Sequence, residues 1–237
     1  PEHIILTATH THNGHGGMVK EWPFRIVSGR YMPEVLEATA RGIAKAMHQA
    51  YTTRCRAALG YGTAKQDVLS SNRREPGGPI DEQIGVLLVD DADGNAIAVV
   101  TNFAAHPTSI PKEDHFAFSA DYPGFYYNEL ERLSPPGCVA LFLNGAQGNQ
   151  TIGSPEGKHG WERTESVGRL LAVRAKEVAN RITCSEVSLR VAWSTPELPP
   201  TLATFEPRTV LLQALEIDGL FMAFFPGEVC VEIGLEL

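Results

Sequence analysis

The chain has 237 residues, of which 43% are hydrophobic and 20% charged, a balance that is ordinary for a globular protein and excludes a disordered or fibrous chain. Its formal net charge is −8 and its basic residues are scattered, with Arg73-Arg74 as the one tight pair, so we expect no nucleic-acid partner. No apolar run is long enough to span a bilayer, and no signal peptide is visible, although the chain does not begin with Met. Its four cysteines lie far apart without CxxC spacing, which predicts small buried residues rather than a zinc site or a disulfide framework.

The first predicted element is a buried strand over residues 3–9, HIILTAT, which is a continuous apolar and β-branched run. The segment THTHNGHGG follows it and places His10, His12 and His15 within six residues. We therefore expect these histidines at the C-terminal end of a strand, where open α/β sheets bind their ligands. Residues 33–51 are predicted to form a helix, because proline suits its first turn and apolar residues recur at every fourth position.

The middle of the chain predicts a hairpin, a short helix and a further strand. Residues 84–106 contain two apolar strands around an Asp-Gly turn, and His106 ends the second of them. A short helix is expected to begin near Asp121. Residues 138–149 form another buried strand, which breaks into a glycine-rich loop over residues 144–151.

The last third predicts one long helix and several strands. Residues 161–182 keep one apolar face and form the clearest helix of the chain. Strands are expected over 185–194, 209–217 and 220–225, the last two joined by a tight Asp-Gly turn, and Glu228 follows in a Pro-Gly-Glu segment that leads into a helix. The pattern predicts an α/β fold, with a mixed β-sheet core flanked by helices, in a single catalytic domain over residues 1–237.

Polar residues at the predicted strand ends suggest a metal site. Four strand ends carry such residues: His10 and His12, His106, the loop over residues 144–151, and Glu228. Histidine and carboxylate at the ends of different strands are what a catalytic zinc takes, with three protein ligands and one position left open for water. In an extended His-x-His pair, both side chains would point to the same side about 6.5–7 Å apart. One histidine of the pair could then ligate the metal while the other acts as a neighbouring hydrogen-bond donor or acid/base.

Each signal also has a structural interpretation when it is taken alone. His-x-His occurs by chance, and a histidine such as His106 at a strand end is more often part of the packed structure than a ligand. An acidic residue after Pro-Gly commonly begins a helix, and the NGAQGN loop is explained by glycines that adopt positive φ. Only the occurrence of all four signals in order favours a metal centre.

This ordered set resembles the catalytic domain of the neutral/alkaline, non-lysosomal ceramidase family. The resemblance extends across nearly the whole chain. It is carried by the segments ATHTHNGHGG, SNRR, VTNFAAHPTSI, FSADYPGF, LFLNGAQGNQT and FFPGE.

The resemblance implies a zinc amidase that splits the N-acyl bond of ceramide into sphingosine and a fatty acid. By the same resemblance, His10, His106 and Glu228 would be the zinc ligands. His12 would lie beside the metal, hydrogen-bond to substrate or water and protonate the leaving amine. Arg73 matches an arginine that lines the family's active site.

The chain departs from the family pattern in two respects. Thr151 stands where the family has an active-site serine, so we expect its hydroxyl to take a catalytic part through hydrogen bonding, while a nucleophilic role is unexpected. The family supplies a further zinc ligand, a tyrosine, well downstream of the Pro-Gly-Glu segment, and this chain ends nine residues after Glu228. We therefore interpret residues 1–237 as a piece of a longer protein that is truncated at both ends. Asp121 matches a family position that is expected to be structural.

Two alternative functions stay open at this point. The cluster also resembles the T-H-x-H-x-D-H motif of metallo-β-lactamase-like hydrolases, although Gly14 stands where that motif has aspartate. A catalytically inactive, ceramidase-like binding domain is the other alternative. His15 has no expected role and is predicted to be solvated.

The expected partner is a lipid or another N-acyl amide, together with association at a membrane surface, while no oligomeric state is indicated. Residues 23–27 and 115–122 are the candidates for an apolar lining around the acyl chains. The family resemblance suggests a secreted or periplasmic location.

Overall fold

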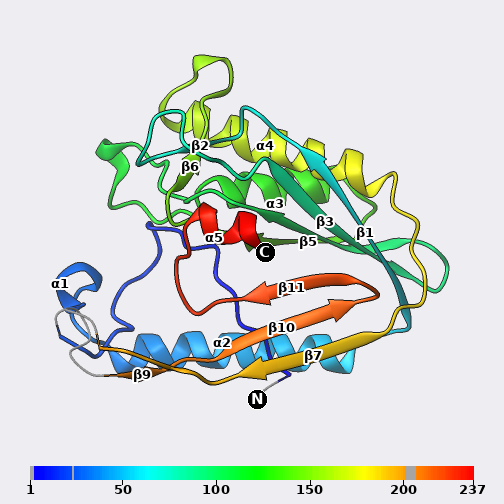
Figure 1. Cartoon of the computed structure of the whole chain (residues 1–237), viewed down its shortest axis with the longest axis horizontal. Helices are drawn as coiled ribbons and strands as arrows, with labels where there is room; N and C mark the ends of the chain where they lie inside the picture. Colours follow the sequence, from blue (N-terminus) through cyan, green and yellow to red (C-terminus); the bar gives the residue numbers. More distant parts are fainter. Residues whose placement is uncertain (1–2, 23, 201–206) are drawn as a thin grey trace.

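The structure is a computed structural model that describes residues 3–22, 24–200 and 207–237 (Figure 1). Its largest sheet has the strand order β1-β3-β4-β5. These strands are β1 (Ala57–Lys65), β3 (Gln83–Asp91), β4 (Ala96–Phe103) and β5 (Val139–Asn144). The pairs β1/β3 and β3/β4 are antiparallel, whereas β4/β5 is parallel. This mixed sheet with helices confirms the predicted α/β class.

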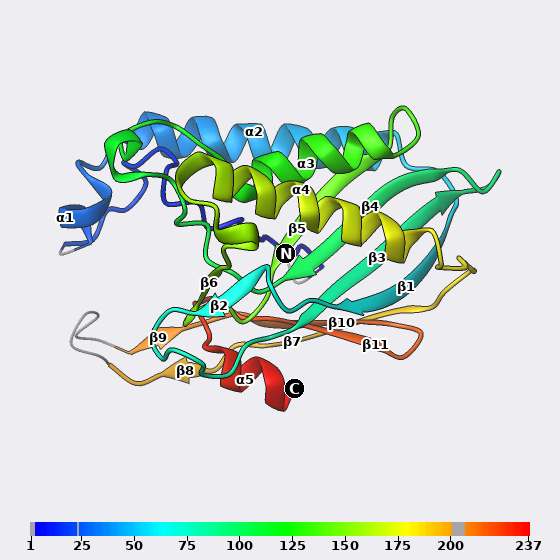
Figure 2. The same cartoon turned by 90° about the horizontal axis from the view of Figure 1, so that it is seen from above.

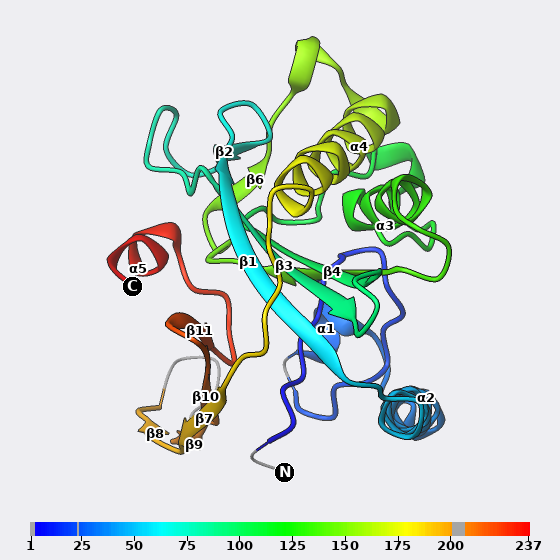
Figure 3. The ribbon, with the colours of Figure 1, turned by 90° about the vertical axis from the view of Figure 1, so that its right-hand side faces the viewer.

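Helices α3 (Tyr122–Leu133) and α4 (Gly160–Ala179) cover one face of this sheet, which Figure 3 shows nearly edge-on. Because side chains alternate along a strand, Ile84, Val86 and Leu88 of β3 all point into the core beneath the helices. The predicted stripe of the long helix packs against them, with Val167 and Leu171 fully buried. Apolar burial between sheet and helices is therefore the main stabilising contribution to the fold.

A second, three-stranded sheet lies on the other side of the first sheet from α3 and α4 (Figures 1 and 3). Its order is β11-β10-β7, from β7 (Leu189–Ser194), β10 (Leu212–Ile217) and β11 (Leu220–Phe224). The predicted tight turn is confirmed, because Asp218 and Gly219 join β10 and β11 with positive φ angles of 43° and 90°.

The remaining elements surround the two sheets (Figure 2). They are α1 (Arg25–Ser28), α2 (Pro33–Thr52), α5 (Val231–Glu236), the strand pairs β2 (Ser70–Asn72) with β6 (Gln150–Ile152) and β8 (Glu197–Leu198) with β9 (Arg208–Thr209), and 3₁₀ turns at Lys112–Asp114 and Pro155–Gly157. Of the helices in the described ranges, none has both the length and the apolarity needed to cross a bilayer.

The predicted strand over residues 3–9 is wrong. In the described part of this segment no residue belongs to a strand, and Ile4 and Leu6 are 43% and 68% exposed. The segment instead crosses the molecule as extended chain, and side-chain amides bind it: Asn144 donates to the carbonyl of Thr9, and Gln213 donates to that of Ile4. A β-branched run favours extended backbone, but a strand also needs a neighbouring strand to pair with.

Strand β1 is absent from the sequence-based prediction because its inner face is made of glycine. A Cβ atom at Gly60 would lie 2.5 Å from the Ile182 side chain, and one at Gly62 would lie 3.1 Å from Val178. Helix α4 and the turn after it can approach β1 closely only because these positions lack side chains. The alternation of apolar residues that would reveal the strand is therefore missing.

Two other expectations were met in part. Helix α2 forms where predicted, but Ile43 and Met47 of its apolar stripe are 43% and 40% exposed. None of the four cysteines forms a disulfide, in line with the prediction, although only Cys138 is buried and Cys55 is exposed.

We predict that Gly168→Ala destabilises the protein and that Gly42→Ala does not. A Cβ atom at Gly168 of α4 would lie 2.5 Å from the Tyr122 carbonyl oxygen of α3, so the two helices would have to separate. A Cβ atom at Gly42 of α2 meets nothing within 4 Å, so alanine should stabilise that helix by up to about 1 kcal/mol. Thermal unfolding of both variants measures the difference, and an unchanged melting temperature for Gly168→Ala would contradict the described α3–α4 packing.

Candidate metal centre

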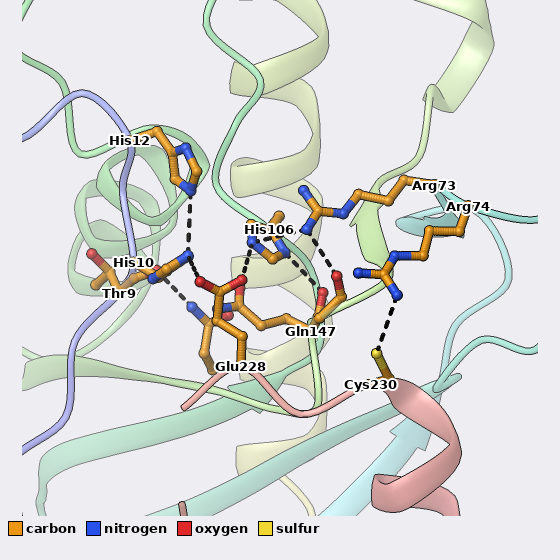
Figure 4. A network of polar contacts seen from close by, with 11 residues as sticks. Thr9, His10, His12, Arg73, Arg74, His106, Gln147, Glu228 and Cys230 are labelled. Atoms are coloured by element: carbon orange, nitrogen blue, oxygen red, sulfur yellow. Dashed lines mark hydrogen bonds and ion pairs between the residues drawn. The ribbon is translucent and has the colours of Figure 1, made fainter. Parts of the chain in front are cut away.

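Three imidazoles and one carboxylate converge on a common point (Figure 4). The Nε2 atoms of His10 and His12 are 3.3 Å apart. The two oxygens of Glu228 reach different histidines, with Oε1 3.2 Å from Nε2 of His10 and Oε2 3.1 Å from Nε2 of His106. The structure thus brings together residues from the start, the middle and the end of the sequence.

The loop that carries His10 and His12 is held by its own polar side chains. Asn13 is buried and donates from its amide to the carbonyls of His115 and Ala117, at 3.0 and 2.9 Å. Thr11 donates to the carbonyl of Ser119 at 2.7 Å. His10 has a φ of 65°, an uncommon conformation for a residue with a side chain, which the surrounding contacts must maintain.

The predicted geometry of the His-x-His pair is wrong because the chain is not a strand here. The ring centroids of His10 and His12 are 5.0 Å apart, closer than the 6.5–7 Å expected for extended chain at about 3.3 Å per residue. The positive φ at His10 turns the backbone, so both Nε2 atoms face the same point.

His106 lies three residues beyond the end of β4, in a fully enclosed position with 1% exposure. Its backbone N–H donates to the carbonyl of Gln150. Its Nδ1 is 2.8 Å from the backbone carbonyl of Gln147, which can only accept, so Nδ1 carries the proton. The Nε2 atom of a neutral His106 therefore presents its lone pair to Glu228.

Glu228 is placed by the glycine-rich loop after β5. Gly148 donates to the carbonyl of Val229 at 2.7 Å, and a Cβ atom on Gly148 would lie 2.9 Å from the Glu228 carbonyl oxygen. Asn149 accepts from the backbone of Val231 and donates to Glu232, which fastens the start of α5. The loop glycines at 145 and 148 thus serve close approach of two chain segments rather than positive φ, which neither adopts.

The electrostatic environment keeps the histidines neutral. Burial lowers the pKa of His10, His12 and His106 below the ordinary value of 6.5, because removal of water disfavours the charged ring. The guanidinium of Arg73 lowers all three pKa values further, while Glu228 opposes the shift. A neutral imidazole is the form that binds a metal ion.

The donor set fits a divalent cation. The lone pair of His106 Nε2 faces a carboxylate oxygen 3.1 Å away, and two acceptors at that distance repel unless a proton or a cation lies between them. Ligand atoms about 2.0–2.1 Å from a tetrahedral zinc lie about 3.3 Å from one another, close to the separations seen here. His10, His12 and His106 also form a group whose nitrogens all lie within 4.8 Å of one another. Two sets of three ligands can therefore hold a metal: His10, His106 and Glu228, or His10, His12 and His106.

Arg73 and Thr151 border the centre differently. Arg73 donates to the carbonyl of Gly148 at 2.8 Å, and its NH2 nitrogen is 3.3 Å from Nε2 of His106, which puts a fixed positive charge beside the centre. Thr151 forms a parallel bridge with His106 through the backbone. In the described ranges its hydroxyl makes no hydrogen bond to His10, His12, His106 or Glu228, so its expected catalytic part stays a prediction.

Two residues that the sequence singled out have non-catalytic surroundings. Asp121 is 1% exposed and caps α3, accepting from the backbone of Tyr122 and of Ser109. His15 is exposed, with its Nε2 3.0 Å from the hydroxyl of Thr39.

A cleft of about 870 Å³ opens from the centre between the two sheets, with His10 and Glu228 in its wall. Its other walls are largely apolar and include Leu6, Leu87, Phe221, Met222, Phe224 and Phe225. The side-chain carbonyl oxygens of Asn144 and Gln147, two further lining residues, are buried without a hydrogen-bond partner in the described structure.

The expected apolar lining from residues 23–27 and 115–122 is therefore not found. None of their described residues lines the cleft, and Pro23 lies outside the described residues. Phe116 and Phe118 point outward instead, 98% and 81% exposed.

The sequence-based prediction missed the amides that position the ligands, chiefly Asn13, Gln147 and Asn149. All three are buried, at 7%, 5% and 4% exposure. The sequence did contain a signal for them: each is an amide residue in a short loop next to a predicted ligand or strand end. There its side chain can hydrogen-bond to backbone N–H and carbonyl groups.

We predict that Asn13→Ala loosens the histidine loop. Loss of the two hydrogen bonds that the buried Asn13 amide donates should lower the free energy of unfolding by about 1–3 kcal/mol and weaken metal binding, since His10 and His12 lose their support. Denaturant unfolding and metal titration measure the two effects. Asn95→Ala, in the exposed turn between β3 and β4, serves as the control and should leave metal affinity unchanged.

We also predict that the chelator-treated protein loses stability as the pH falls below about 6.5. The folded-state pKa values of the three site histidines are lowered, so the unfolded chain binds more protons in this range. Their contribution is complete above the unfolded pKa and is lost as the pH falls towards the folded pKa. Melting temperatures from pH 8 to pH 5 should decline less steeply for His106→Gln than for the wild type, whereas the exposed-helix variant His48→Gln should follow the wild type.

Comparisons with known proteins give a consistent result. Residues 1–149 match the family model described as neutral/alkaline non-lysosomal ceramidase, N-terminal. The neutral ceramidase of Pseudomonas aeruginosa is 26% identical over 199 residues, which span 75% of this chain and 29% of that protein. The fold matches the crystal structure of neutral ceramidase from Pseudomonas aeruginosa with a TM-score of 0.80 at 19% identity, over 97% of this chain and 49% of that one. A ceramidase complexed with C2 matches with a TM-score of 0.79 at 18% identity, over 97% and 51%. The chain thus spans about half the length of the solved relatives and less than a third of the curated one.

Proposed function

Because the chain belongs to the neutral/alkaline non-lysosomal ceramidase family, we propose that it carries the metal centre of a zinc-dependent hydrolase that cleaves the N-acyl amide bond of ceramide or a related N-acyl lipid. The observation that carries this proposal is the convergence of His10, His106 and Glu228 at the mouth of a largely apolar cleft. A metal site beside apolar walls suits a substrate with a polar amide and a long acyl chain.

His10 and His106 would hold the ion through Nε2, and Glu228 through its carboxylate. Zinc bound there would polarise the amide carbonyl and lower the pKa of water. The hydrogen bond from Nδ1 of His106 to the Gln147 carbonyl fixes the ring and its tautomer, as is common for metal-binding histidines. We prefer this trio to the one with His12 because a carboxylate balances the charge of the cation and leaves an imidazole for proton transfer.

His12 and Arg73 would act on the reacting amide. His12 is exposed, and its lowered pKa leaves it neutral near pH 7, so its Nε2 can accept a proton as water adds to the carbonyl carbon. The same nitrogen can then return the proton to the amine as the C–N bond breaks, which yields a carboxylic acid and a free amine. Arg73 supplies a fixed positive charge for the developing oxyanion, and loss of such a group costs about 10²–10³ in rate.

The cleft would take the apolar part of the substrate. Phe221, Phe224 and Phe225 present aromatic surface to the space beneath His10 and Glu228.

Zinc content is the first test. We expect about one zinc per chain in the wild type and in His48→Ala, and a large loss in His10→Ala, His106→Ala and Glu228→Ala. His12→Ala should keep its zinc if the carboxylate trio is correct. Undiminished zinc in both His10→Ala and Glu228→Ala would end the assignment, and loss in His12→Ala would favour the three-histidine site.

Release of fatty acid from a labelled N-acyl sphingosine is the second test, and it addresses the alternatives. Activity that zinc restores after chelation supports the hydrolase. A zinc-loaded protein that releases no fatty acid from any N-acyl amide would instead support the inactive binding domain. Two zinc ions per chain would favour a metallo-β-lactamase-like site, an alternative that family membership and Gly14 in place of its aspartate already disfavour.

A further inference from the structure

Five large apolar side chains project from α1 with the segment before it, and from the loop around residues 115–118, at the end of the molecule that carries the metal centre. We call this set the apolar tip: Trp22, Ile26, Val27, Phe116 and Phe118, with exposed fractions of 71%, 68%, 86%, 98% and 81%. None of them lines the cleft described above. Large apolar side chains that gather, exposed, at one end of a molecule mark a site of interaction rather than part of the packed core.

The two segments of the apolar tip are linked through the histidine loop. Asn13 binds the carbonyls of His115 and Ala117, on either side of Phe116. Four residues later, Gly17 donates to the carbonyl of Ser28, the last residue of α1. Figures 1 and 2 accordingly show α1 and the segment around residues 112–118 at the same end of the molecule.

The surroundings of α1 are basic on an acidic chain. Residues 20–30 contain three basic side chains, Lys20, Arg25 and Arg30, against one acidic side chain, Glu21, while the whole chain has a net charge of −8. Arg208 of β9 adds a further cation, with its guanidinium 5.9 Å from the ring centre of Phe24. Phe24 is only half-buried and anchors α1, while Ile26 and Val27 remain exposed.

We propose that the apolar tip inserts into the headgroup region of a lipid bilayer and docks the metal centre on the membrane surface. A tryptophan, two phenylalanines and two aliphatic side chains beside basic residues are the composition of interfacial membrane anchors. The side chains stand on projecting segments and are almost fully exposed, which suits a soft lipid surface that can surround each of them. The cations would face the phosphate groups of anionic lipids.

The reason for such docking rests on the proposed function, because a hydrolase of N-acyl lipids must reach a substrate that resides in membranes. Phe116 and Phe118 lie in the segment to which Thr11 and Asn13 bind. Their insertion would therefore bring the loop of His10 and His12 to the bilayer surface. The docking itself can be measured without any turnover.

The test is co-sedimentation of the full chain with vesicles of phosphatidylcholine containing one-fifth phosphatidylglycerol and no ceramide. We expect Phe116→Ser/Phe118→Ser to lower the partition coefficient at least about tenfold, since burial of one such ring contributes about 1.5–3 kcal/mol. Tyr51→Ser is the matched control: Tyr51 is 65% exposed at the far end of α2, and its loss should leave binding unchanged.

Trp22 gives a second readout on the other segment. Brominated phosphatidylcholine should quench the tryptophan fluorescence of the wild type, and Trp22→Phe should remove most of this quenching. Binding that is equal in the wild type and the double variant, or quenching that survives Trp22→Phe, would overturn the proposal. A dimer in sedimentation equilibrium that the double variant dissociates, without vesicle binding, would assign the surface to a second copy instead.

A substrate pair separates this inference from the proposed function. The double variant should lose hydrolysis of a long-chain N-acyl lipid in vesicles and keep hydrolysis of a water-soluble short-chain amide. Loss of neither would overturn the docking surface. Vesicle binding without hydrolysis of either substrate would refute the proposed function and leave the docking surface standing.

Discussion

The rest of the centre depends on one interaction, in which the carboxylate of Glu228 lies between two neutral imidazoles. Each of its oxygens faces a nitrogen of a different histidine, at 3.2 and 3.1 Å. Burial and Arg73 both work against protonation of those rings. The arrangement is thus rich in lone pairs and poor in protons, and a positive ion is the simplest species that stabilises it.

The fold assembles this centre from loops rather than from the strands themselves. His106 follows β4, the glycine-rich loop follows β5, and Glu228 follows β11, so three strand ends of two sheets meet at one point. Hydrogen bonds from buried amides and backbone groups fix the positions of these loops, because a loop lacks the regular backbone hydrogen bonds that hold a strand in a sheet. The metal site is rigid to the extent that these few hydrogen bonds are satisfied.

The sequence predicted the fold class, the long helices and the hairpin, because each depends on residue patterns over short distances. The meeting of His10, His106 and Glu228 was expected from the family resemblance of six short segments, since residues so far apart in sequence share no local pattern. The sequence-based prediction failed for residues 3–9, where local preference for extended backbone was correct but no partner strand exists. It missed β1, where Gly60 and Gly62 replace the apolar alternation. It also explained the glycines of the NGAQGN loop by positive φ. Gly148 instead allows close contact with the segment of Glu228, eighty residues further along the chain. Contacts between distant segments leave little trace in local sequence.

The close approach of Gly148 to the Glu228 segment has a consequence for how the protein assembles. The acidic ligand belongs to one of the last segments in sequence, and α5 is fastened to the body through Asn149. Closing so long a loop is slow, so the two histidines from earlier segments can be in place before the carboxylate arrives. Occupancy by a cation would then tie the Glu228 segment to the two histidines, and withdrawal of the cation would favour local opening of that segment before the sheets themselves unfold.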